Sequence, residues 1–217
     1  MKAKLLIAAI FTGAALMAAA PAENLVLKQD FENGVDQFVK APPTVKYFSK
    51  AKPELVDGRV QGTKAVHFGE KSAESTLRGM KMPVPGNISM WIKTDNKITQ
   101  KHVYRRFIAT TYSGTGYFGL QEYAGYALLF VHGFNKKNKN VFVKAMEAAK
   151  WNHVSINFAD KHVDVYVNGV LTSSADLPES ISKVIGNIVY GSKGVSMDSL
   201  EIYNRILTAD EVKALAK

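Results

Sequence analysis

Residues 151–174 read WNHVSINFADKHVDVYVNGVLTSS and carry the clearest secondary-structure signal of the chain. Apolar residues stand at every second position in 154–158 and again in 163–167, and the two runs meet at a short turn. Residues 185–215, IGNIVYGSKGVSMDSLEIYNRILTADEVKAL, add a glycine-containing loop, a further strand and a short helix. The end of the chain therefore predicts two paired antiparallel strands, then another strand and a closing helix.

The period of two sorts the side chains of the paired strands onto opposite faces. The apolar face carries Val154, Ile156, Phe158, Val163, Val165 and Val167. The other face, which the alternation predicts to be exposed to solvent, carries His153, Ser155, Asn157, Asp164 and Tyr166. Such side chains can hydrogen-bond sugar hydroxyls and stack on a sugar ring. They predict a glycan-binding surface, and an ordinary solvated sheet face is the alternative interpretation.

Other β-rich runs follow one another along the chain, with turn-forming residues such as Asp57-Gly58 and Pro85-Gly86 between them. They cover 25–27, 65–68, 88–92, 103–112, 117–123, 126–131, 141–144, 188–190 and 200–203. Many short strands at this spacing predict an all-β sandwich or jelly roll. The prolines between 41 and 55 predict that this segment crosses the sandwich irregularly and forms no central strand.

Two segments have helical character. Residues 146–150 are rich in alanine and predict a single turn. In the last segment Thr208 can cap a helix and Glu211, three residues on, can reach back to form a capping box. We expect Val212 and Leu215 to face inward, so that this helix acts as a lid on the sandwich with no chemistry of its own.

Together these features resemble a laminin-G-like domain of the concanavalin A-like lectin/glucanase superfamily. The resemblance covers most of residues 23–217 at low specificity. It rests on GRVQGTKAVHFG (58–69), GNISMWIKT (86–94), WNHVSINF (151–158) and MDSLEIYNRILTADEV (197–212). It implies a concanavalin A-like antiparallel β-sandwich with a short C-terminal helix, in which Trp91 and Trp151 are buried anchors. Most members of this fold bind or cut glycans, so the resemblance implies sugar recognition.

Glucanases of this superfamily carry acidic residues in the pattern E-x-D-x-x-E, which places the two catalytic carboxylates on one face of a strand. This chain lacks the pattern. Asp198 and Glu201 are three apart and would face opposite ways on a regular strand, and Glu122 stands alone in its strand. The leading prediction is therefore a non-catalytic, lectin-like domain. The alternatives are a polysaccharide hydrolase or lyase whose carboxylates converge from separate strands, and a structural or adhesion protein.

No cofactor is expected, with calcium left open because some members of the superfamily bind it through loop carboxylates. The candidate ligands here are Asp30, Glu32, Asp160 and Asp198. None of them falls in a loop with EF-hand spacing. The chain has no cysteine, which excludes disulfides and thiol chemistry.

Aromatic residues gather between 104 and 134, with Arg105 and Arg106 among them. This mixture could serve single-stranded nucleic acid or acidic sugars, and the sandwich pattern favours sugars. Arg105 and Tyr123 are therefore further candidates for the sugar-binding groove. Phe107 and Ile108 compete for the inward position of their strand, and a bulge at Arg105-Arg106 would resolve the conflict.

Residues 1–22 predict a cleaved signal peptide and hence a secreted or periplasmic protein. Lys2 and Lys4 precede an apolar run that is short for a membrane span of about 20 residues, and Ala20-Pro21-Ala22 fits a cleavage site. Residues 23–217 would form one domain with no further span. Cleavage would reduce the net charge of +9 by two. The remaining positive charge favours an anionic carbohydrate partner, and the alternative interpretation is that it only keeps the protein soluble.

Overall fold

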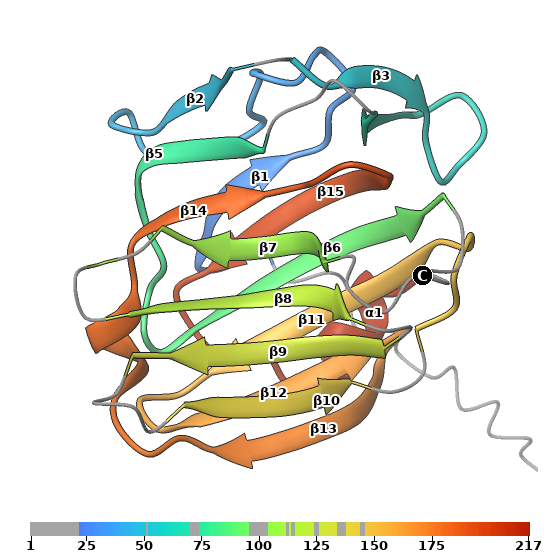
Figure 1. Ribbon diagram of the computed structural model, residues 1–217. Helices are drawn as coiled ribbons and strands as arrows, with labels where there is room; N and C mark the ends of the chain where they lie inside the picture. Colours follow the sequence, from blue (N-terminus) through green and yellow to red (C-terminus); the bar gives the residue numbers. More distant parts are fainter. Residues whose placement is uncertain are drawn as a thin grey trace, which may run out of the picture.

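A computed structural model describes residues 22–50, 52–69, 74–95, 104–111, 113, 116–123, 126–133, 138–143 and 146–217. The predicted signal peptide lies outside the described residues except for Ala22. The described chain forms two stacked antiparallel sheets and one short α-helix (Figure 1). This confirms the predicted all-β sandwich. Among the described residues, no helix has the length and apolar character that crossing a membrane requires.

Sheet A carries the features that matter for the candidate site. Its strands lie in the order β13-β12-β11-β6-β15-β4-β3, and β1 pairs with the remaining part of β15. Their bounds are β1 Leu25–Gln29, β3 Glu54–Asp57, β4 Lys64–Phe68, β6 Gly86–Thr94, β11 Asn152–Phe158, β12 His162–Val167, β13 Val170–Asp176 and β15 Val195–Tyr203.

Sheet B packs against the inner face of sheet A, and its strands lie in the order β10-β9-β8-β7-β14-β5-β2. Their bounds are β2 Lys46–Ser49, β5 Ser75–Lys81, β7 Tyr104–Thr110, β8 Tyr117–Tyr123, β9 Tyr126–His132, β10 Lys139–Val143 and β14 Asn187–Tyr190. A short 3₁₀ helix, η1 (Ile181–Val184), precedes β14. The core between the sheets contains all six residues of the predicted apolar face of β11 and β12.

Four strands lie where none was predicted: β2, β3, β5 and β13. Residues 41–55 were predicted to be irregular, but they contain β2 and the first two residues of β3, so the prediction is wrong at those positions. Both strands lie at the ends of their sheets, so the segment holds no central strand. The predicted helical turn at 146–150 is also wrong, because the chain there forms a tight turn in which Ala149 has φ of 58°.

A bulge resolves the competition between Phe107 and Ile108. The register between β7 and β8 shifts between Arg106 and Ile108. Because of this shift Phe107 and Ile108 are both buried. The predicted bulge therefore exists, one position further along the strand.

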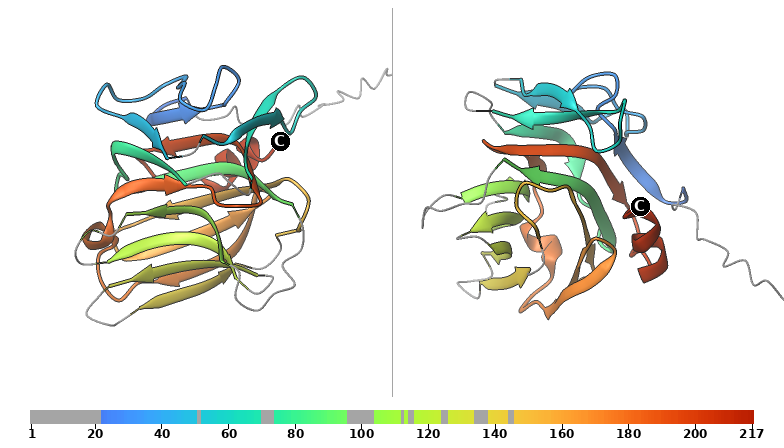
Figure 2. Two further views of the ribbon diagram at one scale, coloured as in Figure 1. Left: turned by 45° about the horizontal axis from the view of Figure 1, so that its top comes forward. Right: turned by 90° about the vertical axis from the view of Figure 1, so that its right-hand side faces the viewer.

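The helix α1 (Ala209–Leu215) begins with the predicted capping box. Thr208 accepts a hydrogen bond from the Glu211 main-chain N–H, and the Glu211 side chain accepts one from the Thr208 N–H at 2.8 Å. The helix lies against the outer face of sheet A (Figure 2). Its Val212 packs there in a small cluster with Tyr166, Tyr203 and Leu207. The helix is therefore a cover on one sheet, rather than the expected lid on the sandwich.

Candidate functional site

Most of the polar face predicted on β11 is buried. His153, Ser155 and Asn157 are each at most 3% exposed. Asn157 binds the main chain just before α1, donating to the Leu207 carbonyl at 2.9 Å and accepting from the Leu207 N–H at 3.0 Å. Asn87 donates to both Ser155 Oγ and Asn157 Oδ1 at 2.8 Å. The predicted solvent exposure of these three side chains is therefore wrong, because this face holds the segment that leads into the helix.

The two candidates on β12 differ in exposure. Tyr166 is 8% exposed in the cluster under α1, and burial raises the pKa of its hydroxyl. Asp164 remains partly exposed, and its Oδ1 lies 3.1 Å from His162 Nε2. The hydrogen bond from His162 Nδ1 to Asp176 is the main cause of the raised pKa of His162. Among the five predicted face residues, Asp164 is the one that solvent reaches most easily.

The last two predicted site residues lie on the other sheet. Arg105 belongs to β7, where its Nη1 is 3.9 Å from Glu122 Oε2. Tyr123 belongs to β8, and its side chain lies outside the described residues. The seven predicted residues are thus divided between the two sheets and form no single surface.

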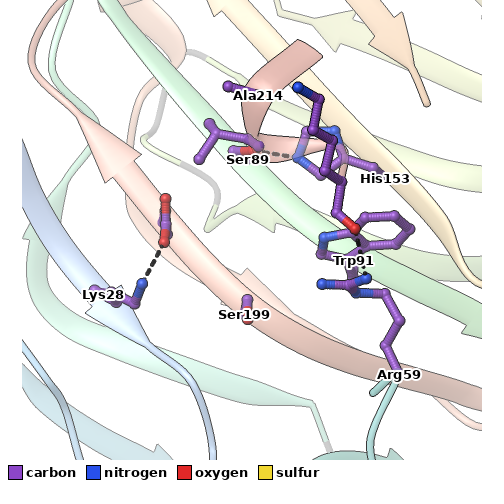
Figure 3. A pocket seen from close by; sticks show the side chains of 10 residues that line it. Lys28, Arg59, Ser89, Trp91, His153, Ser199 and Ala214 are labelled. Atoms are coloured by element: carbon purple, nitrogen blue, oxygen red, sulfur yellow. Dashed lines mark hydrogen bonds and ion pairs between the residues drawn. The ribbon is translucent and has the colours of Figure 1, made fainter. Parts of the chain in front are cut away.

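A cavity of about 230 Å³ opens on the outer face of sheet A, beside α1 and the loop that carries Arg59 (Figure 3). We call it the helix pocket. It is lined by Lys28, Arg59, Ser89, Trp91, His153, Ser199, Glu201, Ala214, Leu215 and Lys217. These residues come from β1, β6, β11, β15, α1 and the loop between β3 and β4, with Lys217 just after α1. His153 is the one predicted site residue among them.

His153 is held in the pocket wall as a neutral imidazole. Its Nε2 lies 2.7 Å from Ser89 Oγ, while its buried Nδ1 has no hydrogen-bonding partner among the described residues. Burial, and secondarily the positive charge of Arg59, lower the pKa of His153 to about 4. At neutral pH the ring is therefore uncharged, and it can serve as a hydrogen-bonding group beside a fixed positive charge.

We expect the imidazole of His153 to titrate near pH 4, against about 6.5 for an unperturbed histidine. Replacing Arg59 with glutamine should raise this midpoint only in part, because burial is the larger cause. A depressed pKa also means that the fold loses stability as the pH falls from 6.5 to about 4. Histidine NMR shifts followed between pH 3 and pH 8 measure the midpoint directly. A midpoint near 6.5 would contradict the buried placement.

Arg59 is fixed above Trp91. Its guanidinium lies 4.1 Å from the centre of the indole ring, and its Nη1 donates to the Lys217 main-chain oxygen at 3.0 Å. The Arg59 main-chain N–H donates to Asp198 Oδ2 at 3.0 Å, which holds the loop in place. The His153 ring centre is 5.2 Å from that of Trp91. Trp91 is thus half-buried in a pocket wall, and its expected role as a buried anchor is wrong.

A bulge in β15 changes where the two nearby carboxylates point. Ser199 has φ of 54°, and the register against β6 shifts between Asp198 and Leu200. Asp198 therefore lies opposite Trp91 and Glu201 opposite Ser89, both on the outer face. The bulge adds one residue, Ser199, between the two carboxylates, so that both side chains point to the same face. The prediction that Asp198 and Glu201 face opposite ways is therefore wrong.

Both carboxylates already have partners. Glu201 Oε1 is 2.8 Å from Lys28 Nζ, and its Oε2 accepts a hydrogen bond from the Tyr203 hydroxyl. Burial and the Glu201 charge raise the pKa of that hydroxyl, which keeps its proton in place. Asp198 holds the Arg59 loop and accepts from Ser199 Oγ at 3.0 Å. Glu201 alone of the two lines the helix pocket.

Each candidate calcium ligand already has a hydrogen-bonding partner within the protein. Asp30 accepts from the Glu32 main-chain N–H, and the Glu32 carboxylate accepts from the Lys64 N–H. Asp160 binds Ser180, and Asp198 lies beside Arg59. Within the described ranges, no group of three or more histidine and acidic side chains is arranged to hold a metal ion.

Sequence reasoning missed Lys28, Arg59 and Glu201 as pocket residues. Glu201 was weighed as a possible catalytic carboxylate, but the bulge in β15 that turns its side chain to the outer face was not predicted. Arg59 lies in a turn-rich stretch whose sequence does not reveal what it contacts. The pairing of β1 with β15 places Lys28 beside Glu201, and α1 supplies another wall of the cavity through Ala214 and Leu215.

A family model described as the concanavalin A-like lectin/glucanases superfamily matches residues 84–213. Among solved structures, the binding domain of Paraclostridial Mosquitocidal Protein 1 is 17% identical, with a TM-score of 0.69 over 89% of this chain and 52% of its own. The botulinum neurotoxin serotype D binding domain is 14% identical, with a TM-score of 0.70 over 89% of this chain and 51% of its own.

A third structure concerns botulinum neurotoxin type C, whose cell entry depends on interaction with two ganglioside molecules. It is 11% identical, with a TM-score of 0.69 over 89% of this chain and 50% of its own. The chain therefore spans about half the length of these structures, and at such identities the similarity concerns the fold alone. Curated protein sequences contain no match to the chain.

Proposed function

The chain belongs to the concanavalin A-like lectin/glucanase superfamily, and we propose that it is a non-catalytic carbohydrate-binding domain with its site in the helix pocket. The observation that carries the proposal is the pocket itself. It joins hydrogen-bonding side chains, a histidine and a tryptophan around one cavity on a rigid sheet. Pockets that bind small ligands commonly combine a concave shape with a few convergent polar groups.

Two further observations support this proposal. The structure for botulinum neurotoxin type C shares the fold over half of its chain, and the cell entry of that toxin depends on gangliosides, which carry sugars. The cavity of about 230 Å³ is smaller than the roughly 300–1,000 Å³ typical of ligand pockets, which suits a single sugar unit of a longer glycan. The proposal includes export to a secreted or periplasmic location through residues 1–22.

The partners of the two nearby carboxylates, Glu201 and Asp198, favour a binding role over bond cleavage. A glycosidase needs two carboxyl groups on either side of the scissile bond, one of them free to give or take a proton. Glu201 is paired with Lys28 and Tyr203, and Asp198 is engaged with the Arg59 loop. The pocket can therefore hold a sugar through fixed charges and hydrogen bonds without cutting it.

A panel of neutral, acidic and sulfated polysaccharides tests this function. We expect retention of the protein on at least one of them in affinity gels, with no reducing ends or unsaturated products released. The panel is run with calcium and with a chelator. Product release would make the protein a hydrolase or lyase, and failure to bind any polysaccharide would leave a structural or adhesion role.

A matched pair of variants locates the site. Replacing Ser89 with alanine removes a pocket hydroxyl, and replacing Asp164 with alanine alters the partly exposed outer face beyond the pocket. If the helix pocket binds the glycan, the Ser89 variant loses affinity and the Asp164 variant keeps it. The reverse result would move the site to the originally predicted surface on β12.

A further inference from the structure

The helix pocket has an uneven charge distribution. Lys28 and Arg59 lie on opposite sides of the cavity, with Ser199 between them (Figure 3). With Lys217, the lining holds three cationic side chains against one acidic side chain, Glu201, which is paired with Lys28. His153 adds no charge at neutral pH. The side chains of Lys28, Arg59, Glu201 and His153 together leave an excess of positive charge in a partly enclosed space.

The indole ring of Trp91, which could stack on a sugar, is already in contact with Arg59 and His153. Sugar-binding sites often place the apolar face of a sugar ring on an indole. Here the guanidinium of Arg59 lies over Trp91 at 4.1 Å, and His153 packs at 5.2 Å from it. Recognition in this pocket therefore depends on charge and hydrogen bonds more than on stacking, which disfavours a purely neutral sugar.

From this arrangement we infer that the helix pocket recognises the carboxylate of an acidic sugar, with Arg59 and Lys28 as its cationic partners. The inference rests on the proposed function and names the class of sugar. A guanidinium presents several N–H donors in a plane that matches a carboxylate, and ion pairs in partly desolvated sites are stronger than those in open water. The net charge of +9, or two less after removal of residues 1–22, assists the approach of such a ligand.

The bound carboxylate should also change the environment of His153. Arg59 contributes to the low pKa of this imidazole, and an anion beside Arg59 offsets that contribution. The pKa of His153 should therefore rise when the ligand binds. This signal arises inside the pocket, so it separates binding there from adsorption elsewhere on a basic protein.

The test titrates the protein with D-glucuronate, D-galacturonate, the methyl ester of D-glucuronate and D-glucose, by calorimetry and by histidine NMR. We expect a uronate to bind at least tenfold more tightly than both the ester and glucose, and to raise the pKa of His153. Acetate and sulfate are added as anions without a sugar. If they bind as tightly as the uronates, the pocket is a simple anion site and the inference fails.

Two arginine variants make the test specific. Arg59→Gln removes one cation of the pocket, and Arg78→Gln removes a cation that lies 3.8 Å over Phe48 on the other sheet. The first should weaken uronate binding at least tenfold and the second should leave it unchanged. Circular dichroism shows whether both variants are folded, and Arg59→Lys, which keeps the charge, should restore part of the affinity if Arg59→Gln unfolds.

The outcomes separate this inference from the proposed function. Equal binding of glucose and glucuronate in the pocket would overturn the acidic specificity while leaving a carbohydrate-binding domain. An equal effect of the two arginine variants would show non-specific attraction to a basic surface, and would overturn the assignment of Arg59. Absence of any sugar-induced change at His153, together with no retention on the polysaccharide panel, would overturn both proposals.

Discussion

Replacing Gly191 with alanine should lower the free energy of unfolding by about 3 kcal/mol or more, through a backbone cost of about 1–2 kcal/mol and an overpacking cost of about 1–3 kcal/mol. Gly191 has φ of +75°, a conformation that side chains rarely adopt. A Cβ atom there would lie 2.2 Å from Cε2 and Cζ of Phe68. Phe68 is fully buried and packs edge-on against Tyr190 at 6.1 Å, so its ring has no room to withdraw.

Gly62 provides the matched control for this prediction. It also has a positive φ, +86°, but a Cβ atom there would have nothing within 4 Å. Gly62→Ala should therefore cost only the backbone term, about 1–2 kcal/mol. Urea unfolding of the two variants beside the unchanged protein measures both losses. Equal losses would mean that Phe68 moves freely, and the tight core described between the sheets would then be incorrect.

The core could be predicted from the sequence because it depends on a local pattern. Val154, Ile156 and Phe158 alternate with polar residues, and a strand has only two faces. The apolar set must then pack inward, as all three do. The start of α1 was also predictable, since the Thr208 and Glu211 capping box involves only four consecutive residues.

Three of the four missed strands, β2, β3 and β13, lack that pattern for a physical reason, which does not apply to β5 inside sheet B. Strand β13 lies at the edge of sheet A, and Val170, Leu171 and Ser174 are all exposed. An edge strand that buries little surface does not need apolar and polar residues to alternate along it, so its sequence resembles that of a loop. Similarly, β2 and β3 are short edge strands in which no residue is buried. Hydrogen bonding to the neighbouring strand, which the sequence does not record, makes them part of a sheet.

The candidate site was predictable only in part because polar residues look alike in two different settings. His153 and Asn157 fit a wet sheet face and fit equally well a hydrogen-bonded contact beneath another segment. The choice depends on where α1 and residue 207 lie, which is a tertiary property. Arg59 and Lys28 come from the other end of the chain, and no local spacing relates them to His153. The period of two identified the face correctly but could not say what covers it.

Replacing Asn157 with alanine should lower the free energy of unfolding by about 3 kcal/mol, although the original expectation placed this side chain in solvent. Its amide makes hydrogen bonds to both polar main-chain groups of Leu207 and accepts one from Asn87. Leu207 is 1% exposed, so the variant leaves its N–H and C=O buried without their partner. Each such group costs about 1–3 kcal/mol.

The same change should loosen α1, because Leu207 precedes the helix directly and Val212 packs in the same cluster. Hydrogen exchange of the α1 amides should become faster in Asn157→Ala, and the helix pocket should lose the wall formed by Ala214 and Leu215. The control is Asn140→Ala, an exposed residue on β10, which should change stability by less than about 0.5 kcal/mol. If the two variants were equally stable, Asn157 would be an ordinary surface residue. The cover that shapes the pocket would then have no anchor at this position, and the solvated face first expected from the alternation would be the better description.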